Sequence, residues 1–405
     1  MKKILYIESN EDGTIGGSHY CLLEIIKRLD REKYLPLVYF YQDNKLVNEF
    51  RKYCKVILKN ESLGINIRKT SPSIYKFLSK NKVTQQLLMM YQKIGNFVFY
   101  YLPYYVNIIY VLIKHRPAAI HMNDVPVLTQ WLLIAKLFGI VVISHIRGHW
   151  SPVGSYKRFV KLYDQFISIS HSVTEFVVLN GVNADKVVTI YDGIDTKTVI
   201  NKKTRSRNEM REELGINEEE FVVCVVGNIK RWKGQHVAIK AIKTLKEKGI
   251  EMKCLIVGDT SKLQDDCAYH NYLTEYTKNN NLSDNIIFTG YRSDIPDIVS
   301  SVDTLLLTST EPEPLGRVVF EGMLFERPVI ATSHGGPAEI LQDGITGILV
   351  PPNDEFILSE KIEYLEKNSQ IAEIIGVNAR KEVMAKYDIG TNIGQIQEIY
   401  RRYIG

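Results

Sequence analysis

The sequence predicts an α/β protein with two domains, each built around a parallel β-sheet. The chain has 405 residues, more than one ordinary core accommodates, so two domains are expected. Short β-branched or aliphatic runs alternate with longer helical patterns along its whole length, which is typical of βαβ units. One run, VVCVVG, is apolar throughout, as expected for a strand buried on both faces of its sheet.

The expected strands fall into two groups. Those of the first half are 4–8, 35–41, 56–58, 118–122, 141–144, 166–170 and 187–190. Those of the second half are 221–226, 254–257, 286–289, 304–308, 329–331 and 348–350. A polar, basic stretch from Asp195 to Met210 separates the groups. We therefore expect two Rossmann-like domains facing across a cleft, at 1–198 and 199–387, and a C-terminal helix of about 388–405 that packs back on the first domain.

The composition narrows the class of protein. Apolar residues make up 45% and charged residues 24%, which fits a soluble globular chain. The net charge of +5 is too mild for a nucleic-acid-binding protein and suits anionic ligands or an anionic membrane surface. The five cysteines are scattered singly, without a CxxC pair, so a metal knuckle is not expected and a reducing, cytoplasmic compartment is.

The strongest functional signal is SSVDTLLLTSTEPEPLGRVVFEGM, where an acidic, proline-rich loop follows a strand and precedes a helix. The carboxyl edge of a parallel sheet is where α/β domains bind ligands. Glu313 and Glu321, eight residues apart, can there accept hydrogen bonds from sugar hydroxyls. The alternative is that both are surface charges. Backbone N–H groups available to an anion belong to Leu315, Gly316 and Arg317.

A second loop, in VVGNIKRWKGQHVAIKAI, follows another strand and is basic. Lys230, Arg231 and Lys233 supply cationic donors that suit a diphosphate leaving group. The alternative is a solvated basic loop. The chain contains no Asp-x-Asp motif, so metal-bridged diphosphate chemistry is not expected, and cations and helix starts would carry the leaving-group charge.

Glycine pairs mark two further strand-to-helix turns. Gly335 and Gly336, in SHGGPAEI, permit close approach of the backbone to a ligand. Gly16 and Gly17 precede a helix expected at about 18–30, where N–H groups can approach a phosphate, although a merely flexible loop is an equal alternative.

Histidines end two strands of the first half. His145, in VVISHIRGHW, can face the cleft and hydrogen-bond a substrate hydroxyl or phosphate. His121, in AIHMND, is the runner-up, and Arg147 joins it as an acceptor-side candidate. A lone histidine is more commonly structural.

An aromatic and aliphatic stretch at 87–113 lies inside a basic region, 68–116. Its length suits a membrane span, but Gln92, Lys93 and Pro103 are among the residues that interrupt it. Helices lying on a membrane surface and ordinary packed helices remain the two alternatives.

Together these motifs resemble the retaining GT-B glycosyltransferases of the group 1, or family 4, class. EPLGRVVFE matches that family's E-x7-E pattern, and GNIKRWKG its GRLxxxKG element. GGPAEI, GITGILVPP and IYDGIDT match further elements in the same order, so the resemblance covers nearly the whole chain. Asn228 replaces the family's usual arginine, leaving Lys230 or Arg231 to supply the cation, and Asp192 replaces its usual asparagine.

The resemblance implies a role for each matched residue. Glu313 and His145 would contact the donor sugar, Glu321 the ribose, Lys233 the diphosphate, and Gly17 would lie near the phosphates. The remaining donor-side positions that it implies are Gly16, Asn228, Arg231, Leu315, Gly316 and Arg317.

The function implied is transfer of a sugar, with retention of configuration, from a UDP- or GDP-linked donor to a glycan or polyprenyl-linked acceptor. No cofactor and no metal are expected, because the nucleotide sugar is itself a substrate. Bacterial surface polysaccharide synthesis, in the cytoplasm or on the inner face of the membrane, is the expected setting. A GT-B sugar-nucleotide epimerase and a non-catalytic sugar-nucleotide-binding protein are the alternatives.

Overall fold

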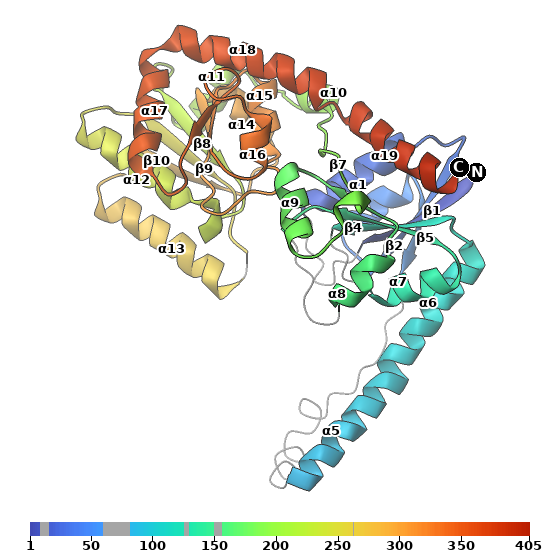
Figure 1. Cartoon of the computed structure of the whole chain (residues 1–405). Coiled ribbons are helices and arrows are strands. Elements are labelled where there is room, and N and C mark those ends of the chain that lie inside the picture. Colours follow the sequence, from blue (N-terminus) through green and yellow to red (C-terminus); the bar gives the residue numbers. More distant parts are fainter. Residues whose placement is uncertain (9–15, 60–81, 125–128, 150–155, 262) are drawn as a thin grey trace.

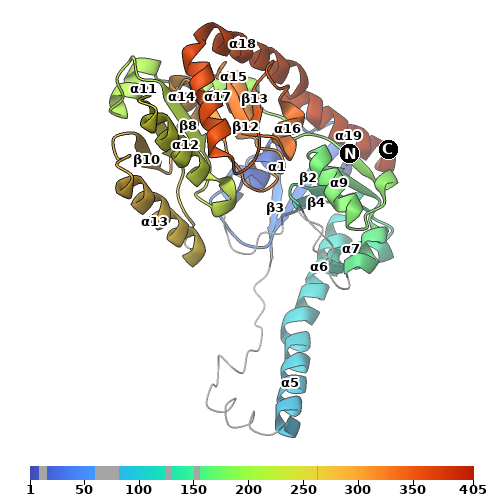
Figure 2. The same cartoon turned by 60° about the vertical axis from the view of Figure 1, so that its left-hand side comes forward.

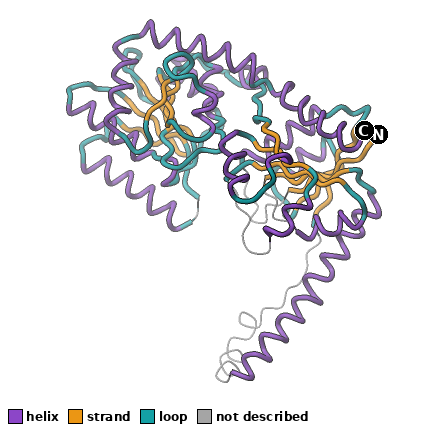
Figure 3. The backbone as a smooth tube through the Cα atoms, in the orientation of Figure 1, coloured by secondary structure: helices purple, strands orange, loops and turns teal. Residues whose placement is uncertain are grey.

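In the computed structural model, residues 1–8, 16–59, 82–124, 129–149, 156–261 and 263–405 are described, and they form two α/β domains (Figure 1). Each domain has one parallel sheet with helices on both faces, as Figure 3 shows with strands in orange and helices in purple. The expected α/β fold class is confirmed, because every strand predicted from the sequence is present within two residues of its predicted bounds.

The N-terminal sheet has seven strands in the order β3-β2-β1-β4-β5-β6-β7. Alternate residues of the interior strand β1 pack on opposite faces: Ile4 and Tyr6 lie against α1 and α19, and Leu5 and Ile7 lie in the cluster that contains α6 and α7. The strands are β1 (Lys2–Glu8), β2 (Tyr34–Phe40), β3 (Lys55–Leu58), β4 (Ala119–Asp124), β5 (Val141–Ile146), β6 (Gln165–Ser168) and β7 (Val187–Thr189).

The helices of this half are α1 (Gly17–Arg28), α2 (Val47–Arg51), α5 (Lys82–Asn96), α6 (Leu102–His115), α7 (Thr129–Leu137), α8 (Tyr156–Phe159) and α9 (His171–Leu179). A π-helical turn at Phe97–Tyr101 joins α5 to α6, and 3₁₀ turns occupy Val160–Leu162 and Ala184–Lys186.

The C-terminal sheet has six strands in the order β10-β9-β8-β11-β12-β13. The chain leaves β8 toward β9 on one side and returns to β11 on the other, so the strand order reverses between β8 and β11. Open α/β sheets bind ligands at such a point, outside the carboxyl ends of the strands. The strands are β8 (Val222–Val226), β9 (Lys253–Val257), β10 (Ile286–Gly290), β11 (Thr304–Leu307), β12 (Val329–Thr332) and β13 (Ile348–Val350).

The helices of the second half are α10 (Thr196–Asn201), α11 (Arg207–Glu213), α12 (Gln235–Glu247), α13 (Gln264–Asn279), α14 (Ile295–Ser301), α15 (Val318–Leu324), α16 (Gly336–Ile340), α17 (Glu355–Lys367), α18 (Ser369–Lys386) and α19 (Ile389–Ile404), with a 3₁₀ turn at Arg231–Lys233. One face of the sheet packs on α12, α13 and α17, and the other on α14, α15 and the end of α18.

The chain crosses between the domains twice, and the two crossings are hydrogen-bonded to each other. Ile194 N donates to Tyr387 O at 2.9 Å, and Ile389 N donates to Ile194 O at 3.1 Å. After the second crossing α19 lies along α1, beside the N-terminal domain (Figure 1). Tyr400 of α19 is fully buried there and bonds His121 Nδ1 at 2.7 Å.

The helix formed by α5, the π-helical turn and α6 projects from the N-terminal domain as an arm (Figures 1 and 2). Its stretch Met89–His115 is long and apolar enough to cross a membrane, and only 24% of that stretch is buried. The basic residues expected at 68–81 lie outside the described residues.

Replacing Ile393 on α19 by alanine tests how far the N-terminal domain depends on this helix. Ile393 is buried among Ile4, Leu22 and Ile26, so the truncation leaves a cavity. We expect the free energy of unfolding, measured by urea denaturation, to fall by about 2–5 kcal/mol. Gln395→Ala, on the exposed side of the same helix, is the control and should change little. Equal losses in the two variants would mean that α19 does not contribute to this core.

Candidate functional site

The candidate site is built from loops at the carboxyl ends of three adjacent strands, β8, β11 and β12. The β11 loop lies between the other two and is bonded to both. Thr310 N donates to Trp232 O in the β8 loop at 2.7 Å, and Gly336 N, after β12, donates to Glu313 O at 2.8 Å.

Two glycines permit this close packing. Gly234 has φ +69°, and a Cβ on it would overlap the carbonyl of Thr308. Gly335 has φ +68°, and a Cβ there would overlap the backbone of Glu313. Any larger residue at either position would force the loops apart and strain the left-handed backbone.

Lys233 and Glu313 meet in the middle of these loops. Lys233 Nζ lies 2.6 Å from Glu313 Oε2, and Ser309 Oγ donates to the same oxygen at 3.0 Å. Lys233 Nζ also lies 4.3 Å from the centre of the Trp232 ring. The lysine predicted to bind a diphosphate is thus held beside the carboxylate predicted to contact the sugar.

Glu321, on α15, lies in a different environment. Burial raises the pKa of its carboxyl group to about 7, although the charges of Arg317 and Lys202 oppose that shift. Within the described part of the chain it has no hydrogen-bond or ion-pair partner. The residue is half-buried, so its carboxyl group keeps acceptor capacity for a ligand.

Arg317 joins the two domains at the start of α15. Its Nη1 donates to Gly17 O, at the start of α1, at 3.4 Å. Leu315 is buried, and Gly316 has φ +74° with Pro337 and Glu313 packed against it. Gly16 is exposed, and its N–H donates to His19 Nδ1 at 3.2 Å.

Asn228 and Arg231, in the same loop after β8 as Lys233, contact residues other than Glu313. Asn228 is exposed, and its carbonyl accepts a hydrogen bond from Gln235 Nε2 at 3.0 Å. The Arg231 guanidinium lies over the rings of Tyr269 and Tyr272, at 5.5 and 5.9 Å from their centres. Of the loop's cations, Lys233 is the one that contacts Glu313.

The structure corrects the expected orientation of His145 and His121: both are fully buried and neither faces the cleft. Their rings lie 5.3 Å apart, on the face of the sheet covered by α1 and α19, because they share that face with Tyr6 and Ile143. Burial lowers both pKa values, that of His121 to about 3, so each ring is neutral.

Arg147 is nearly as inaccessible, at 8% exposed. It forms a buried ion pair with Asp192, and its Nε donates to Asn123 Oδ1 at 3.1 Å. Its Nη2 lies 3.3 Å from His145 Nδ1. Asp192, which replaces the family's usual asparagine, therefore neutralises Arg147. Both acceptor-side candidates, His121 and Arg147, lie beneath the cleft surface.

Sequence reasoning missed two residues at the domain boundary. His149, to which the sequence analysis gave no role, lies with its Nε2 3.1 Å from Ser172 Oγ at the start of α9, and burial lowers its pKa. Glu339, on α16, accepts hydrogen bonds from the backbone N–H groups of His171 and Ser172 at 2.8 and 2.6 Å and from Tyr191 Oη at 2.7 Å. For Glu339, the signal in the sequence was the GGPAEI segment that contains it.

Side chains suited to a metal do not gather in the described ranges, where no three His, Cys, Asp or Glu groups form a ligand set. The arrangement is instead one of a cation, two carboxyl groups and backbone N–H groups at the point where the strand order reverses. Such a set can hold a phosphorylated, hydroxyl-rich ligand.

Family comparisons match both halves of the chain. Residues 15–198 match the model of "Glycosyltransferase Family 4", and residues 206–382 match that of "Glycosyl transferases group 1". The first segment contains β2 to β7 of the N-terminal sheet, and the second contains all six strands of the C-terminal sheet.

Two curated relatives come from bacteria. Spore coat protein SA of Bacillus subtilis is 27% identical over 55% of this chain and 61% of that protein. The capsular polysaccharide biosynthesis glycosyltransferase CapM of Staphylococcus aureus is 26% identical over 59% of this chain and 61% of that protein. The alignments thus span less than two thirds of these relatives.

Among solved structures, Anabaena Alr3699/HepE in complex with UDP has a TM-score of 0.77 and 23% identity, covering 99% of this chain and all of that one. At this identity the likeness establishes the fold, which is GT-B.

Glu321 gives this site a pH-dependent effect on stability. Its pKa is about 7 in the folded chain and near 4.5 when unfolded, so between these values the folded state binds the extra proton. Its contribution to stability is therefore present below about pH 4.5 and is lost as the pH rises through about 7. We expect Glu321→Gln to gain stability relative to the wild type across that window, as measured by urea denaturation at a series of pH values. Glu360→Gln, at an exposed position, is the control, and parallel pH profiles for wild type and Glu321→Gln would refute the assignment.

Proposed function

We propose that this chain, a GT-B protein with a family 4 N-terminal domain and a group 1 C-terminal domain, transfers a sugar from a nucleotide-sugar donor to a glycan or lipid-linked acceptor. The observation that carries the proposal is the Lys233–Glu313 pair, where the strand order of the matched C-terminal domain reverses. The Anabaena neighbour, solved with UDP and also with UDP-glucose, supports a nucleotide sugar as the donor and UDP as its nucleotide.

Each group has a part in the proposed donor complex. Lys233 and Arg317 stabilise the negative charge that develops on the departing diphosphate, without a metal. Glu321, which is half-buried, accepts hydrogen bonds from the ribose hydroxyls. Glu313 holds Lys233 in place and contacts the sugar.

We propose retention of the anomeric configuration. The acceptor hydroxyl attacks the anomeric carbon on the face from which the nucleotide leaves. The bond from that carbon to the phosphate oxygen breaks as the new glycosidic bond forms, and the departing phosphate takes the hydroxyl proton. Proton NMR of the product shows the configuration directly. An inverted product would contradict retention, and isomerised donor without transfer would indicate an epimerase.

Lys233→Ala tests the donor site. We expect turnover to fall by about a hundredfold or more, the scale measured when an enzyme loses one charge-stabilising donor. The assay follows nucleotide release from UDP- and GDP-sugars in the presence of acceptor. Lys278→Ala removes an equal charge at an exposed position at the end of α13 and should keep full activity. Unchanged turnover in Lys233→Ala would contradict the role given to this lysine. Activity that EDTA abolishes and Mg²⁺ restores would contradict a metal-free reaction.

We further propose that the arm formed by α5 and α6 contacts the cytoplasmic face of a membrane and brings the enzyme to a lipid-linked acceptor, as in bacterial surface polysaccharide assembly. Exposed apolar side chains on the arm include Met90, Phe97, Phe99 and Tyr110. Tyrosine and phenylalanine favour the membrane interface, and lysines favour anionic lipid.

The topology favours a helix inserted from one side over a span. β3, before the arm, and β4, after it, belong to the same sheet, so a crossing by the helix would require the chain between 59 and 82 to cross back. That stretch contains Arg68, Lys69, Lys76 and Lys80, whose charges are costly in the bilayer core.

Phe99→Asp tests the membrane contact. We expect it to reduce co-sedimentation with liposomes that contain anionic lipid, because a charge would have to enter the interface. Phe356→Asp is the matched control: Phe356 is 65% exposed on α17, and Phe99 is 55% exposed on the arm. Equal binding by the two variants, or no binding by the wild type at low salt, would remove the support for membrane contact.

A further inference from the structure

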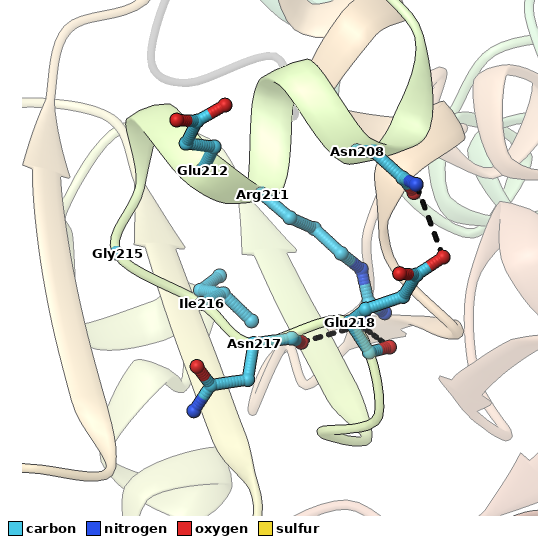
Figure 4. Close-up of a pocket in the computed structure, with 7 residues that line it drawn as sticks. All are labelled: Asn208, Arg211, Glu212, Gly215, Ile216, Asn217 and Glu218. Atoms are coloured by element: carbon cyan, nitrogen blue, oxygen red, sulfur yellow. Dashed lines mark hydrogen bonds between the residues drawn. The ribbon is translucent and has the colours of Figure 1, made fainter.

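Two hollows lie in the C-terminal domain away from the cleft. One, of about 420 Å³, lies beside Arg211 (Figure 4). The guanidinium of Arg211 is fully engaged: Nε donates to Ser301 O, Nη1 to the carbonyls of Asn217, Glu218 and Glu220, and Nη2 to Asp303. Every nitrogen of this buried arginine therefore already donates within the protein.

The other hollow, of about 330 Å³, is lined by four cationic side chains: Lys203, Arg207, Arg327 and Arg380. Two of them are neutralised. Arg207 pairs with Asp303 at 2.6 Å, and Arg380 pairs with Glu326 at 2.9 Å.

Lys203 and Arg327 have no carboxylate partner among the residues that the structure describes. The Nε of Arg327 is buried without a hydrogen-bond acceptor, which is costly for a charged donor. Burial lowers the pKa of Arg327, and the charge of Arg207 lowers it further. The hollow thus combines uncompensated positive charge with an unused donor.

We propose that this hollow is a second anion site, which binds a small phosphate-bearing ligand. Guanidinium groups match the oxygens of a phosphate in geometry and charge, and a bound phosphate would compensate the positive charge of Lys203 and Arg327. The site is separate from the donor cleft: Arg317, before the start of α15, contacts the N-terminal domain, whereas Arg327 follows the end of that seven-residue helix.

The position of the hollow suggests what a bound anion does. Lys203 follows α10, on the first crossing between the domains, and Arg380 is on α18, which leads into the second. The crossings are already bonded through Ile194 and Tyr387. An anion held by both Lys203 and Arg380 would add a contact between the two chain segments on the C-terminal side of these crossings.

The test is a calorimetric titration of the full chain with inorganic phosphate. We expect millimolar binding by the wild type and a loss of roughly tenfold or more in affinity in Arg380→Ala, the scale for one charge-assisted hydrogen bond. Lys381→Ala is the matched control, because it removes an equal charge from the neighbouring exposed position of α18. Lys233→Ala, in the donor cleft, should keep the part of phosphate binding that Arg380→Ala removes.

Arg327→Lys keeps the charge but loses the planar fork, and we expect it to weaken binding while circular dichroism confirms that the variant is folded. Three results would overturn the proposal: no binding by the wild type at millimolar phosphate, equal affinity in Arg380→Ala and Lys381→Ala, or loss of binding only in Lys233→Ala. The last would place phosphate in the donor cleft alone. None of these measurements requires transferase activity.

Discussion

The backbone contact between Glu313 and the glycine pair after β12 fixes the rest of the candidate site. Gly335 pairs with Glu313 as an isolated bridge, and Gly336 donates to its carbonyl. This contact fixes the backbone of Glu313, whose side chain then meets Lys233. Since β8, β11 and β12 are adjacent and parallel, three separate sequence segments end at one place. The chemistry of the site thus depends on how closely its loops pack.

Contacts between the domains make the cleft a shared structure. Glu339 satisfies two free N–H groups at the start of α9 and also accepts from Tyr191, so one C-terminal carboxylate holds the N-terminal domain at three points. Arg317 adds a contact to Gly17. These bonds are few and lie at the surface of the domains, whereas the paired crossings at Ile194 and Tyr387 are continuous with the chain. Motion of the domains about the crossings would break the Glu339 and Arg317 bonds and keep the bonds between the crossings.

The N-terminal domain supports its side of the cleft with a buried polar network. Arg147 bonds Asp192, Asn123 and His145, and Asn123 Nδ2 donates to Glu8 at 2.7 Å. Removing one member would leave a charged or polar partner buried and unsatisfied, which costs more than the net gain from the intact pair. The network therefore positions the strand ends below the cleft, and none of its members needs to contact a substrate.

The sequence by itself determined the strands, their grouping into two domains and the loops that carry Lys233, Glu313 and Glu321. Apolar runs and turn residues specify strands locally, and parallel strands bring their carboxyl ends to one edge. Only the tertiary structure decided which face each side chain occupies. His145 was expected in the cleft, but its place in the alternation of β5 puts it under α1 and α19, and α19 comes from the other end of the chain. Glu339 likewise acquires its partners, His171, Ser172 and Tyr191, from the other domain, which no local pattern encodes.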